Sequence, residues 1–399
     1  MNRKPIIAGV GMTSFGDHSN KNLKDLGLIA INQALSDSGL DFSSIEAVWA
    51  GSAGAPLITG QVCINGQVVL QDINYKQVPI INVENACATA STAFQQAATM
   101  VELGAYDVVL AFGVEKLYHP ERQRVGQVFM GCTDTTDPDA LYHFLGREAD
   151  AAQRHSVFMD IYAAIAKQYM ESSGATKRHF AQIAAKNSYH GSLNEYAQFH
   201  DVLSVEDILN ARTIVEPLTL PMCSPLGDGA AAAVLVSPRM AKKLGLTAPV
   251  FVRSSVLASG ASLENLPDLT SNTAHKAYQL AGIDPKELDC VELHDATAPA
   301  EMIYYEALGL CGPGEGPALV EDGATSLGGR IPVSISGGLI RKGHPIGATG
   351  LAQIFELTQQ LRGLAGARQV EGAKVALAEN GGGWLGNDAA AIAITVLSS

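Results

Sequence analysis

The chain has 399 residues, of which 47% are hydrophobic and only 17% are charged. This composition favours a large globular core and excludes a disordered chain. The formal net charge is −13, which argues against a broad nucleic-acid-binding surface because such surfaces are basic. A local basic patch could still hold an anionic cofactor.

The six cysteines are scattered, and no two have the CxxC spacing of metal ligands. We therefore predict no metal site and no disulfide framework in this chain, and a reducing cytoplasm as its location. The apolar run at residues 5–11 is short and broken by glycines, so it predicts a first β-strand rather than a secretion signal. No stretch approaches the roughly 18 apolar residues of a membrane helix, and we expect no membrane segment.

The first half of the chain predicts alternating helices and strands. Residues 30–51 read as a helix, a stop at Gly39, a short turn and a buried strand. Further along, an alanine-rich helix at 88–103 is followed by a strand at 107–112. Such an alternation is typical of an α/β protein.

Cys87 lies between a short apolar strand at residues 79–81 and the alanine-rich helix. A helix N-terminus stabilises a thiolate through its free N–H groups and its dipole. The same N–H groups could stabilise an oxyanion formed after nucleophilic attack. This segment alone leaves open whether Cys87 is a nucleophile or a buried structural cysteine.

Residues from about 115 to 215 have no counterpart in the second half of the chain. They contain polar and aromatic clusters such as Tyr118-His119-Pro120 and Tyr142-His143-Phe144, and we predict that they form a cap inserted over the site. The alanine-rich run at 230–236 that follows predicts a strand covered on both faces.

The second half of the chain repeats the first. Residues 273–294 align with residues 30–51, and Gly282 takes the place of Gly39. The further matching elements, in order, are a helix at 348–361, a strand at 374–378 and an alanine-rich strand at 389–396. Because the matched pairs occur in the same order, we infer a duplication.

Two similar halves that each mix strands and helices predict an α/β architecture. We expect two packed sheets with helices between and outside them. We place the N-terminal half at residues 1–245, including the inserted cap, and the C-terminal half at residues 246–399.

Two histidines of the second half lie where a side chain could reach a site. His294 follows a predicted strand, and open α/β sheets bind ligands at the carboxyl ends of their strands. His344 lies among glycines on a loop, and Pro345 fixes the entry into the next helix. Either could instead be a satisfied structural histidine, but the loop position favours a functional role for His344.

Glu379 ends a predicted buried strand just before three consecutive glycines, Gly381 to Gly383. The backbone N–H groups of a glycine loop can point at an anion, although a tight turn would need the same glycines. The carboxyl group of Glu379 is therefore either a general base or a solvated or ion-paired group.

Three segments together resemble the thiolases: the sequence around Cys87, Gly343-His344-Pro345-Ile346-Gly347-Ala348-Thr349-Gly350, and the glycines at 381–383. Their order and spacing match over nearly the full length, and the segment around His344 is highly specific. Within the family, the chain is similar to the sterol-carrier or lipid-transfer branch, which includes archaeal acetyl-CoA acetyltransferases. The supporting segments are Asp228–Ala232, Gly113–Lys116, Lys186–His190, Asn194–Phe199 and His294-Asp295.

The resemblance implies the five-layer αβαβα thiolase fold and a homodimer or a dimer of dimers. It also implies a CoA-dependent acyltransferase, with coenzyme A as cosubstrate and no permanently bound cofactor. Cys87 would attack the keto carbon of a 3-oxoacyl-CoA, cleavage of the carbon–carbon bond would leave an acyl group on Cys87, and a second coenzyme A would take that group.

The resemblance also assigns roles around the nucleophile. His344 would deprotonate Cys87 and help to bind the enolate oxygen. The backbone N–H groups of Cys87 and Gly381 would form one oxyanion hole. His294 would replace the family's asparagine that holds a water in the other.

Two departures from the family pattern concern the proton donor. Most thiolases have a second cysteine just before the glycine loop, where this chain has Glu379. The sterol-carrier branch instead has a cysteine at the position two residues after the histidine of the His-Asp pair, where this chain has Ala296. Our hypothesis is that Glu379 shuttles the proton, together with His294, since a carboxylic acid can do this if its pKa is raised.

The missing second cysteine also suggests that the released enolate is bulkier than that of acetyl-CoA. One member of this kind cleaves 2-benzoylsuccinyl-CoA to benzoyl-CoA and succinyl-CoA, and this reaction is our substrate hypothesis. Members of the branch often pair with a small zinc-ribbon/OB-fold subunit, which would be a separate polypeptide here. The residues that contact coenzyme A are not identified, although arginine and lysine residues of the insert are candidates for its phosphates.

Two rival functions remain open. Relatives that degrade steroid side chains are retro-aldolases, which are lyases without a thiolate nucleophile; the presence of both Cys87 and His344 argues against this function. A non-catalytic scaffold or lipid-binding protein is supported only by the missing second cysteine. Fast reaction of Cys87 with a thiol reagent near neutral pH would distinguish an activated thiolate from a structural thiol.

Overall fold

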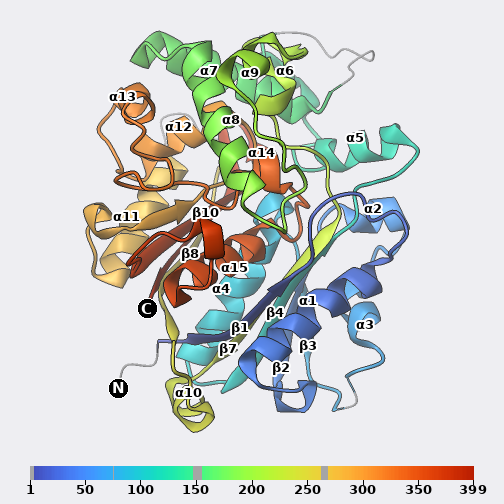
Figure 1. Ribbon diagram of the computed structural model, residues 1–399. Helices are drawn as coiled ribbons and strands as arrows, with labels where there is room; N and C mark the ends of the chain where they lie inside the picture. Colours follow the sequence, from blue (N-terminus) through green and yellow to red (C-terminus); the bar gives the residue numbers. More distant parts are fainter. Residues whose placement is uncertain (1–3, 75, 147–154, 262–267) are drawn as a thin grey trace.

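The computed structural model describes residues 4–74, 76–146, 155–261 and 268–399 (Figure 1). Its main sheet has nine strands in the order β3-β2-β4-β7-β1-β8-β11-β10-β9. The strands are β1 (Ile6–Met12), β2 (Ala47–Gly51), β3 (Ile80–Val83), β4 (Val108–Glu115), β7 (Gly229–Val236), β8 (Val250–Ser259), β9 (Cys290–Glu292), β10 (Val375–Leu385) and β11 (Asp388–Ser398), and a separate pair is formed by β5 (Thr213–Val215) and β6 (Leu218–Thr219).

The strand order contains the same pattern twice. The N-terminal half has the order β2-β4-β7-β1, and the C-terminal half has the order β9-β10-β11-β8. In each run the first pair is parallel and the next two pairs are antiparallel. Even β3, which pairs in parallel with β2, has a counterpart in a parallel bridge between Val291 of β9 and Val333.

The two halves of the sheet are joined, whereas the sequence predicts two separate packed sheets. The junction consists of two residue pairs between β1 and β8, Ile6 with Phe251 and Ile7 with Val250. The duplicated strand pattern could not reveal this junction, because the two edge strands meet over only these pairs.

Five layers result from the way helices cover the two halves of the sheet. The helices α4 (Thr89–Glu102) and α15 (Thr349–Arg362) contact strands of both halves and each other, so they form the central layer. On the outside, α1 (Leu23–Ser38) covers the N-terminal strands and α11 (Leu269–Ala281) covers the C-terminal strands (Figure 1). This confirms the predicted αβαβα architecture.

Local sequence explains where the two outer helices begin and end. Asn22 caps α1 in a capping box with Asp25, and Asp268 caps α11 by accepting hydrogen bonds from backbone N–H groups of its first turn. Both helices end at a left-handed glycine, Gly39 and Gly282, each with φ of 68°. Because glycine adopts this conformation without a steric penalty, the predicted glycine stops are confirmed.

The alanine-rich strand β7 is fully buried because it is covered on both faces. Ala231 and Ala233 belong to the core around the central helices, and Ala230 and Ala232 belong to the core under α1. Small side chains let helices approach the sheet closely from both sides.

A helical region inserted between β4 and β7 lies over one end of the α/β body (Figure 1). It coincides with the predicted cap, of which residues 147–154 lie outside the described part. Its helices are α5 (Arg122–Met130), α6 (Pro138–Phe144), α7 (Val157–Ser173), α8 (Lys177–Ser192) and α9 (Val205–Asn210).

The remaining helices are short and connect the larger elements. They are α2 (Ala55–Thr59), α3 (Asn65–Leu70), α10 (Pro238–Leu244), α12 (Ala298–Ala307), α13 (Gly316–Glu321) and α14 (Gly338–Lys342), with the 3-10 turns η1 (Phe42–Ser44), η2 (Ala86–Ala88), η3 (Leu220–Met222), η4 (Pro285–Glu287) and η5 (Gly366–Arg368).

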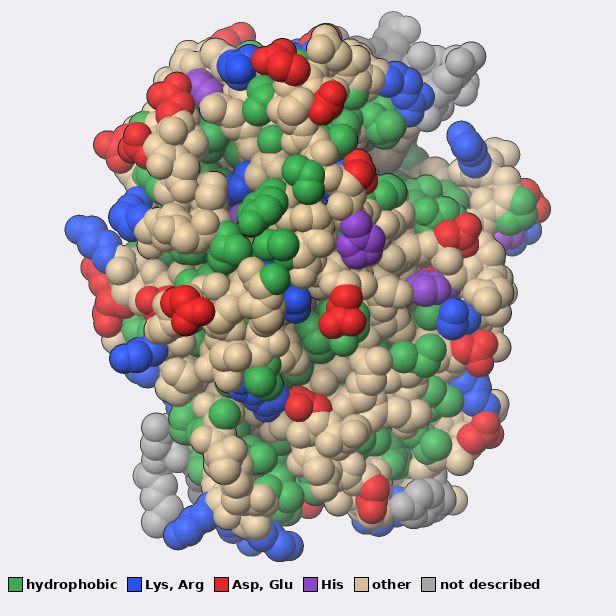
Figure 2. All heavy atoms as spheres, viewed as in Figure 1, with side chains coloured by type: hydrophobic (Ala, Val, Ile, Leu, Met, Phe, Trp, Pro, Cys, Tyr) green, Lys and Arg blue, Asp and Glu red, His purple; other side chains and the backbone are tan. Residues whose placement is uncertain are grey.

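Among the described helices, none combines the length and the apolar character that a membrane crossing requires. On the face drawn in Figure 2, the described acidic and basic side chains are interspersed rather than gathered into one basic surface. This distribution agrees with the net charge of −13.

Candidate active site

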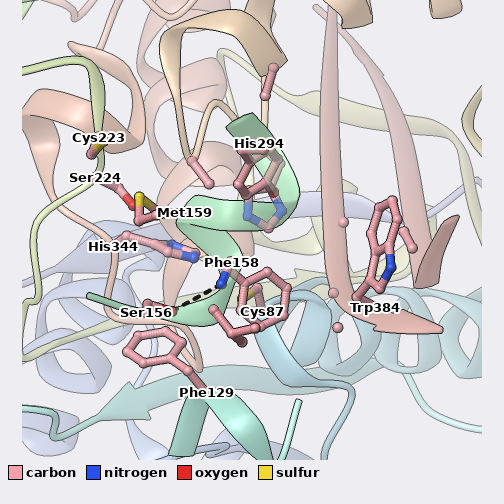
Figure 3. Close-up of a pocket in the computed structure, with 18 of the residues that line it drawn as sticks. Cys87, Phe129, Ser156, Phe158, Met159, Cys223, Ser224, His294, His344 and Trp384 are labelled. Carbon is pink, nitrogen blue, oxygen red and sulfur yellow. Dashed lines mark hydrogen bonds between the residues drawn. The ribbon is translucent and has the colours of Figure 1, made fainter. Parts of the chain in front are cut away.

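A cavity of about 1770 Å³ lies between the α/β body and the inserted helices, and it is lined by Cys87, His294 and His344 (Figure 3). One ligand-type atom from each of these three side chains lies within 4.8 Å of the other two. The structure therefore brings together three residues that are far apart in the sequence.

The duplicated topology explains why Cys87 and His344 meet. Cys87 lies just before α4, and His344 lies five residues before the start of α15. The first turns of these helices touch so closely that a Cβ atom on Gly350 would lie 1.9 Å from the Ser91 Oγ. Each half thus places one candidate catalytic side chain, Cys87 or His344, near the start of its central helix.

Cys87 lies in the 3-10 turn η2 and not within the first turn of α4. The preceding Ala86 has a φ of 47°, in the left-handed region that a non-glycine residue rarely adopts. Burial raises the pKa of the Cys87 thiol well above its usual range, and the neighbouring Cys132 adds to this effect. Burial therefore favours the neutral thiol of Cys87, whereas the sequence predicts a thiolate stabilised by the helix N-terminus; that thiolate stays a prediction.

His344 is held in one orientation by its neighbour in the chain. Its Nδ1 lies 2.7 Å from the Oγ1 of Thr349, and the Thr349 hydroxyl donates to the carbonyl oxygen of Pro345 at 3.1 Å. Because the single hydroxyl proton is used in that bond, Nδ1 donates to Oγ1 and the other ring nitrogen, Nε2, is free to accept a proton. Burial, with the nearby His294 and Lys342, holds the pKa of His344 well below its usual range.

His294 follows β9 and lies beside His344, with 5.0 Å between the ring centroids and an angle of 58° between the ring planes. Its Nδ1 lies 3.4 Å from the Nδ2 of Asn380. Burial lowers the pKa of His294 to about 4, although hydrogen bonding to the backbone of Gly381 opposes the shift. Both imidazoles are therefore neutral near neutral pH.

Glu379 lies directly behind His294 and is fully buried. Its Oε2 accepts the backbone N–H of His294 at 2.8 Å, whereas its Oε1 has no hydrogen-bond partner among the residues that the structure describes. Burial raises the pKa of Glu379 to about 8, which keeps the carboxyl group mostly protonated at neutral pH. The group is not itself part of the cavity wall; the neighbouring Gly381 is.

The three glycines after Glu379 belong to β10 and do not form the predicted loop. Gly381 and Gly382 pair with Ile392 and Ala391 of β11. Gly383 interrupts the ladder with a φ of 66°. A loop was expected because glycine usually disfavours a strand, but here the neighbouring backbone leaves no room for a side chain.

The close approach occurs at Gly382. A Cβ atom there would lie 2.2 Å from the carbonyl oxygen of Asn85 and 2.6 Å from the backbone nitrogen of Ala88. The strand therefore packs directly against the turn that carries Cys87. The backbone of Gly383 hydrogen bonds towards the Cys87 sulfur and lowers its pKa, a contact that sequence reasoning missed by naming only Gly381.

A buried polar network links the cap to the histidines. Asp295 accepts hydrogen bonds from the backbone N–H of Leu339 at 2.8 Å and from the Nδ2 of Asn187 at 2.9 Å. Asn187 of α8 also donates to Glu301 at 2.7 Å, and Lys186 forms an ion pair with the same carboxylate. This network fixes both the residue after His294 and the short helix before His344.

The cap contributes aromatic residues that the sequence did not single out. Phe129 and Phe158 lie beside Cys87 and form an edge-to-face pair with 6.3 Å between centroids (Figure 3). Tyr162 also lines the cavity; burial raises its pKa, and Cys87 and Glu379 add to the shift. The aromatic clusters of the insert were the available signal, and Tyr118, Tyr142 and Phe144 also line the cavity.

The structure also places the remaining residues that the sequence analysis named for the site. Ala296, where a second cysteine could occur, lines the cavity and is 5% exposed. Arg122 and Arg212 are exposed residues of the insert that also line it. They fit the predicted phosphate contacts, and that role stays a prediction.

Comparison with known proteins places these residues in a family context. Residues 6–239 match the thiolase N-terminal domain, and residues 257–395 match the thiolase C-terminal domain-like family. The chain is 37% identical to rabbit (Oryctolagus cuniculus) sterol carrier protein 2 over 390 residues, which cover 94% of this chain and 69% of that protein.

Two further similarities concern a bacterial subunit and a solved structure. The benzoylsuccinyl-CoA thiolase subunit BbsB of Thauera aromatica is 38% identical over 379 residues, covering 93% of this chain and 92% of that protein. The structure titled "Ltp2-ChsH2(DUF35) aldolase" has the same fold, with a TM-score of 0.80, 23% identity, and coverage of 99% of this chain and 98% of that chain. With both halves matched in order, this chain belongs to the thiolase family.

Proposed function

We propose that this protein is a CoA-dependent thiolase that cleaves or forms a 3-oxoacyl-CoA through an acyl group on Cys87. The observation that carries this proposal is the convergence of Cys87, His294 and His344 within 4.8 Å at an aromatic-lined cavity. A scaffold protein would have no need to aim two neutral imidazoles and a thiol at one point.

The first step is attack by Cys87 on the keto carbon. The free Nε2 of His344 takes the thiol proton as the sulfur–carbon bond forms, which avoids a stable thiolate in a buried site. The carbon–carbon bond then breaks, and its electrons leave with the CoA-linked fragment as an enolate. Acyl-Cys87 remains. The sulfur of a second coenzyme A then attacks the acyl carbon, the bond from that carbon to the Cys87 sulfur breaks, and the departing Cys87 sulfur takes up the proton that the coenzyme A thiol gives up.

Backbone and side-chain donors would stabilise the oxyanions of these steps. We assign the tetrahedral oxyanion to the N–H groups at Cys87 and Gly381, with the N–H of Gly383 as an additional donor near the sulfur. His294 and His344 face the place where the enolate oxygen would form.

Glu379 supplies the proton that the enolate carbon needs. Support comes from its raised pKa of about 8 and from its unpartnered Oε1. Since the carboxyl group lies behind His294, the proton reaches the cavity through His294 or a water beside Gly381. This arrangement takes the place of the second cysteine.

For the substrate we propose 2-benzoylsuccinyl-CoA, which would give benzoyl-CoA and succinyl-CoA. The edge-to-face pair of Phe129 and Phe158 beside Cys87 can enclose a flat aromatic acyl group. The relative BbsB carries this substrate in its name.

We also propose a homodimer, a separate partner subunit and a cytoplasmic location. The edge position of β3 leaves a strand available for contact with a second copy. BbsB is itself named a subunit, which supports a partner chain. Full activity and tight coenzyme A binding by the isolated chain would argue against that partner.

The test is to incubate the full chain separately with benzoyl-CoA, acetyl-CoA and succinyl-CoA, with and without a co-encoded partner. Intact-mass and peptide spectra should show a benzoyl group on Cys87, and a Cys87→Ser variant should show none. In a parallel incubation with a 3-hydroxyacyl-CoA, cleavage to an aldehyde or ketone, with no adduct from the three acyl-CoAs, would instead support the retro-aldolase. Neither adduct nor cleavage would support the scaffold.

A further inference from the structure

We propose that Cys87, His294 and His344 form a binding site for a soft divalent cation such as Zn²⁺, and that the bound ion reversibly blocks the nucleophile. The three donor atoms lie within 4.8 Å of one another. In a tetrahedral zinc site with bonds of about 2.0–2.3 Å, donor atoms are about 3.3–3.8 Å apart. Closing the gap requires a movement of about 1 Å, within the reach of side-chain rotation.

The donor set favours zinc over the hard cations. One thiolate and two imidazoles are the ligands of catalytic zinc sites that keep a fourth position open. The two imidazoles are already neutral, so their nitrogen lone pairs need no deprotonation before they bind. The cysteine releases its proton when the sulfur–zinc bond forms, and the products are the zinc thiolate and one proton.

Hydrogen bonds made by the ring nitrogens that point away from the site orient both imidazoles. The bond from Nδ1 of His344 to Thr349 leaves its Nε2 free. The ring of His294 hydrogen bonds to the backbone of Gly381, which lies beside its Nδ1, and donation from Nδ1 to that carbonyl group leaves Nε2 of His294 free. Such outer contacts are the usual support of metal-bound histidines.

The cavity gives the ion an entry path and a fourth ligand. All three side chains line the same space of about 1770 Å³, which can supply water. The thiol of coenzyme A could take the same place, since a thiolate is a better zinc ligand than water. The metal-bound state would then compete with acyl transfer for the sulfur of Cys87.

The test uses Co²⁺ as a spectroscopic probe on the anaerobic full-length protein. We expect a near-ultraviolet thiolate-to-cobalt charge-transfer band that saturates at one ion per chain and is displaced by Zn²⁺. Cys87→Ser, and wild-type protein alkylated at Cys87, should lose the band. His294→Gln and His344→Gln should weaken binding by more than about 100-fold.

Matched controls are Cys132→Ser, next to Cys87, and Cys223→Ser, a buried cysteine that lines the same cavity. Both should keep the band. A band that persists without Cys87, or that is absent from the folded wild type, would overturn the proposal. Because the spectrum requires no turnover, a failed metal site is distinguishable from a failed thiolase assignment.

Discussion

At the scale of single residues, Glu379 is the proposed proton donor, in place of the second cysteine that the family resemblance implies. The position of Glu379 favours a neutral acid, because its Oε1 is buried without a partner in the described part of the chain. An amide of the same size can keep the shape of the site but cannot deliver a proton. The Glu379→Gln variant therefore separates the proton-transfer step from all other steps.

We predict that Glu379→Gln lowers the rate of carbon–carbon cleavage by about 100-fold or more, the usual contribution of a general acid. Exchange of labelled coenzyme A into benzoyl-CoA requires no protonation of carbon, so it should stay within a few-fold of wild type. Both rates can be measured on the same preparation. Equal loss of the two reactions would show that Glu379 only supports the site.

The same residue should make folding stability depend on pH. The pKa of Glu379 is raised from 4.5 to about 8 in the folded protein, so its contribution to stability is complete below about pH 4.5 and is lost as pH rises through 8. Urea unfolding at pH 6 and pH 9 should show a smaller loss of stability for Glu379→Gln than for wild type. An identical loss of stability in both proteins would contradict a raised pKa of Glu379.

At the scale of secondary-structure elements, the carboxylate of Glu115 connects the loop that carries His344 to the N-terminal half of the chain. Glu115 at the end of β4 accepts backbone N–H groups from Gly54 at 3.0 Å and Gly347 at 2.9 Å, and also from Ala55. Burial raises its pKa to about 7. The loop that carries His344 is thereby joined to the helix α2.

We predict that Glu115→Gln destabilises the protein by about 2–4 kcal/mol at pH 8, because an amide NH₂ group would face buried N–H donors. Acylation of Cys87 should also slow, since Gly347 lies three residues after His344. Glu46→Gln is the control, because Glu46 is exposed and also accepts a backbone N–H, that of Val108, at 3.1 Å. Comparable destabilisation by both variants would argue against a special role for Glu115.

The sequence patterns predicted the helices and strands better than they predicted the contacts between them. The repeated helix, glycine stop and strand located α1, β2, α11 and β9, since local capping and burial determine these elements. Reading the glycines after Glu379 as a loop was wrong, because only the packing of Gly382 against the Cys87 turn explains a strand there. The aromatic clusters of the insert indicated a cap over the site, and Tyr118, Tyr142 and Phe144 line the cavity. The pairing of Phe129 with Phe158 depends on tertiary placement, which no local pattern encodes.

At the scale of the whole molecule, the duplication matters because it brings the N-terminal turns of α4 and α15 into contact. Thiolase chemistry as proposed here needs a nucleophile from one half and a base from the other, so the contact between α4 and α15 sets their separation. Gly350 is a point of very close approach in that contact. An added Cβ would lie 1.9 Å from the Ser91 Oγ and 2.7 Å from the Ser91 backbone nitrogen.

We predict that Gly350→Ala pushes the two helix starts apart, destabilises the protein by about 1–3 kcal/mol, and slows acylation of Cys87 more than it weakens acyl-CoA binding. The control for stability alone is Gly126→Ala in α5, where an added Cβ meets no described atom within 4 Å and stability should change by less than about 1 kcal/mol; Gly126 lines the cavity, so its acylation rate is not a reference. Urea unfolding and the rate of the mass-detected adduct give the two readouts. If Gly350→Ala were folded and acylated at the wild-type rate, the spacing of the central helices would not control the reaction, and the duplicated fold would serve only to bury the site.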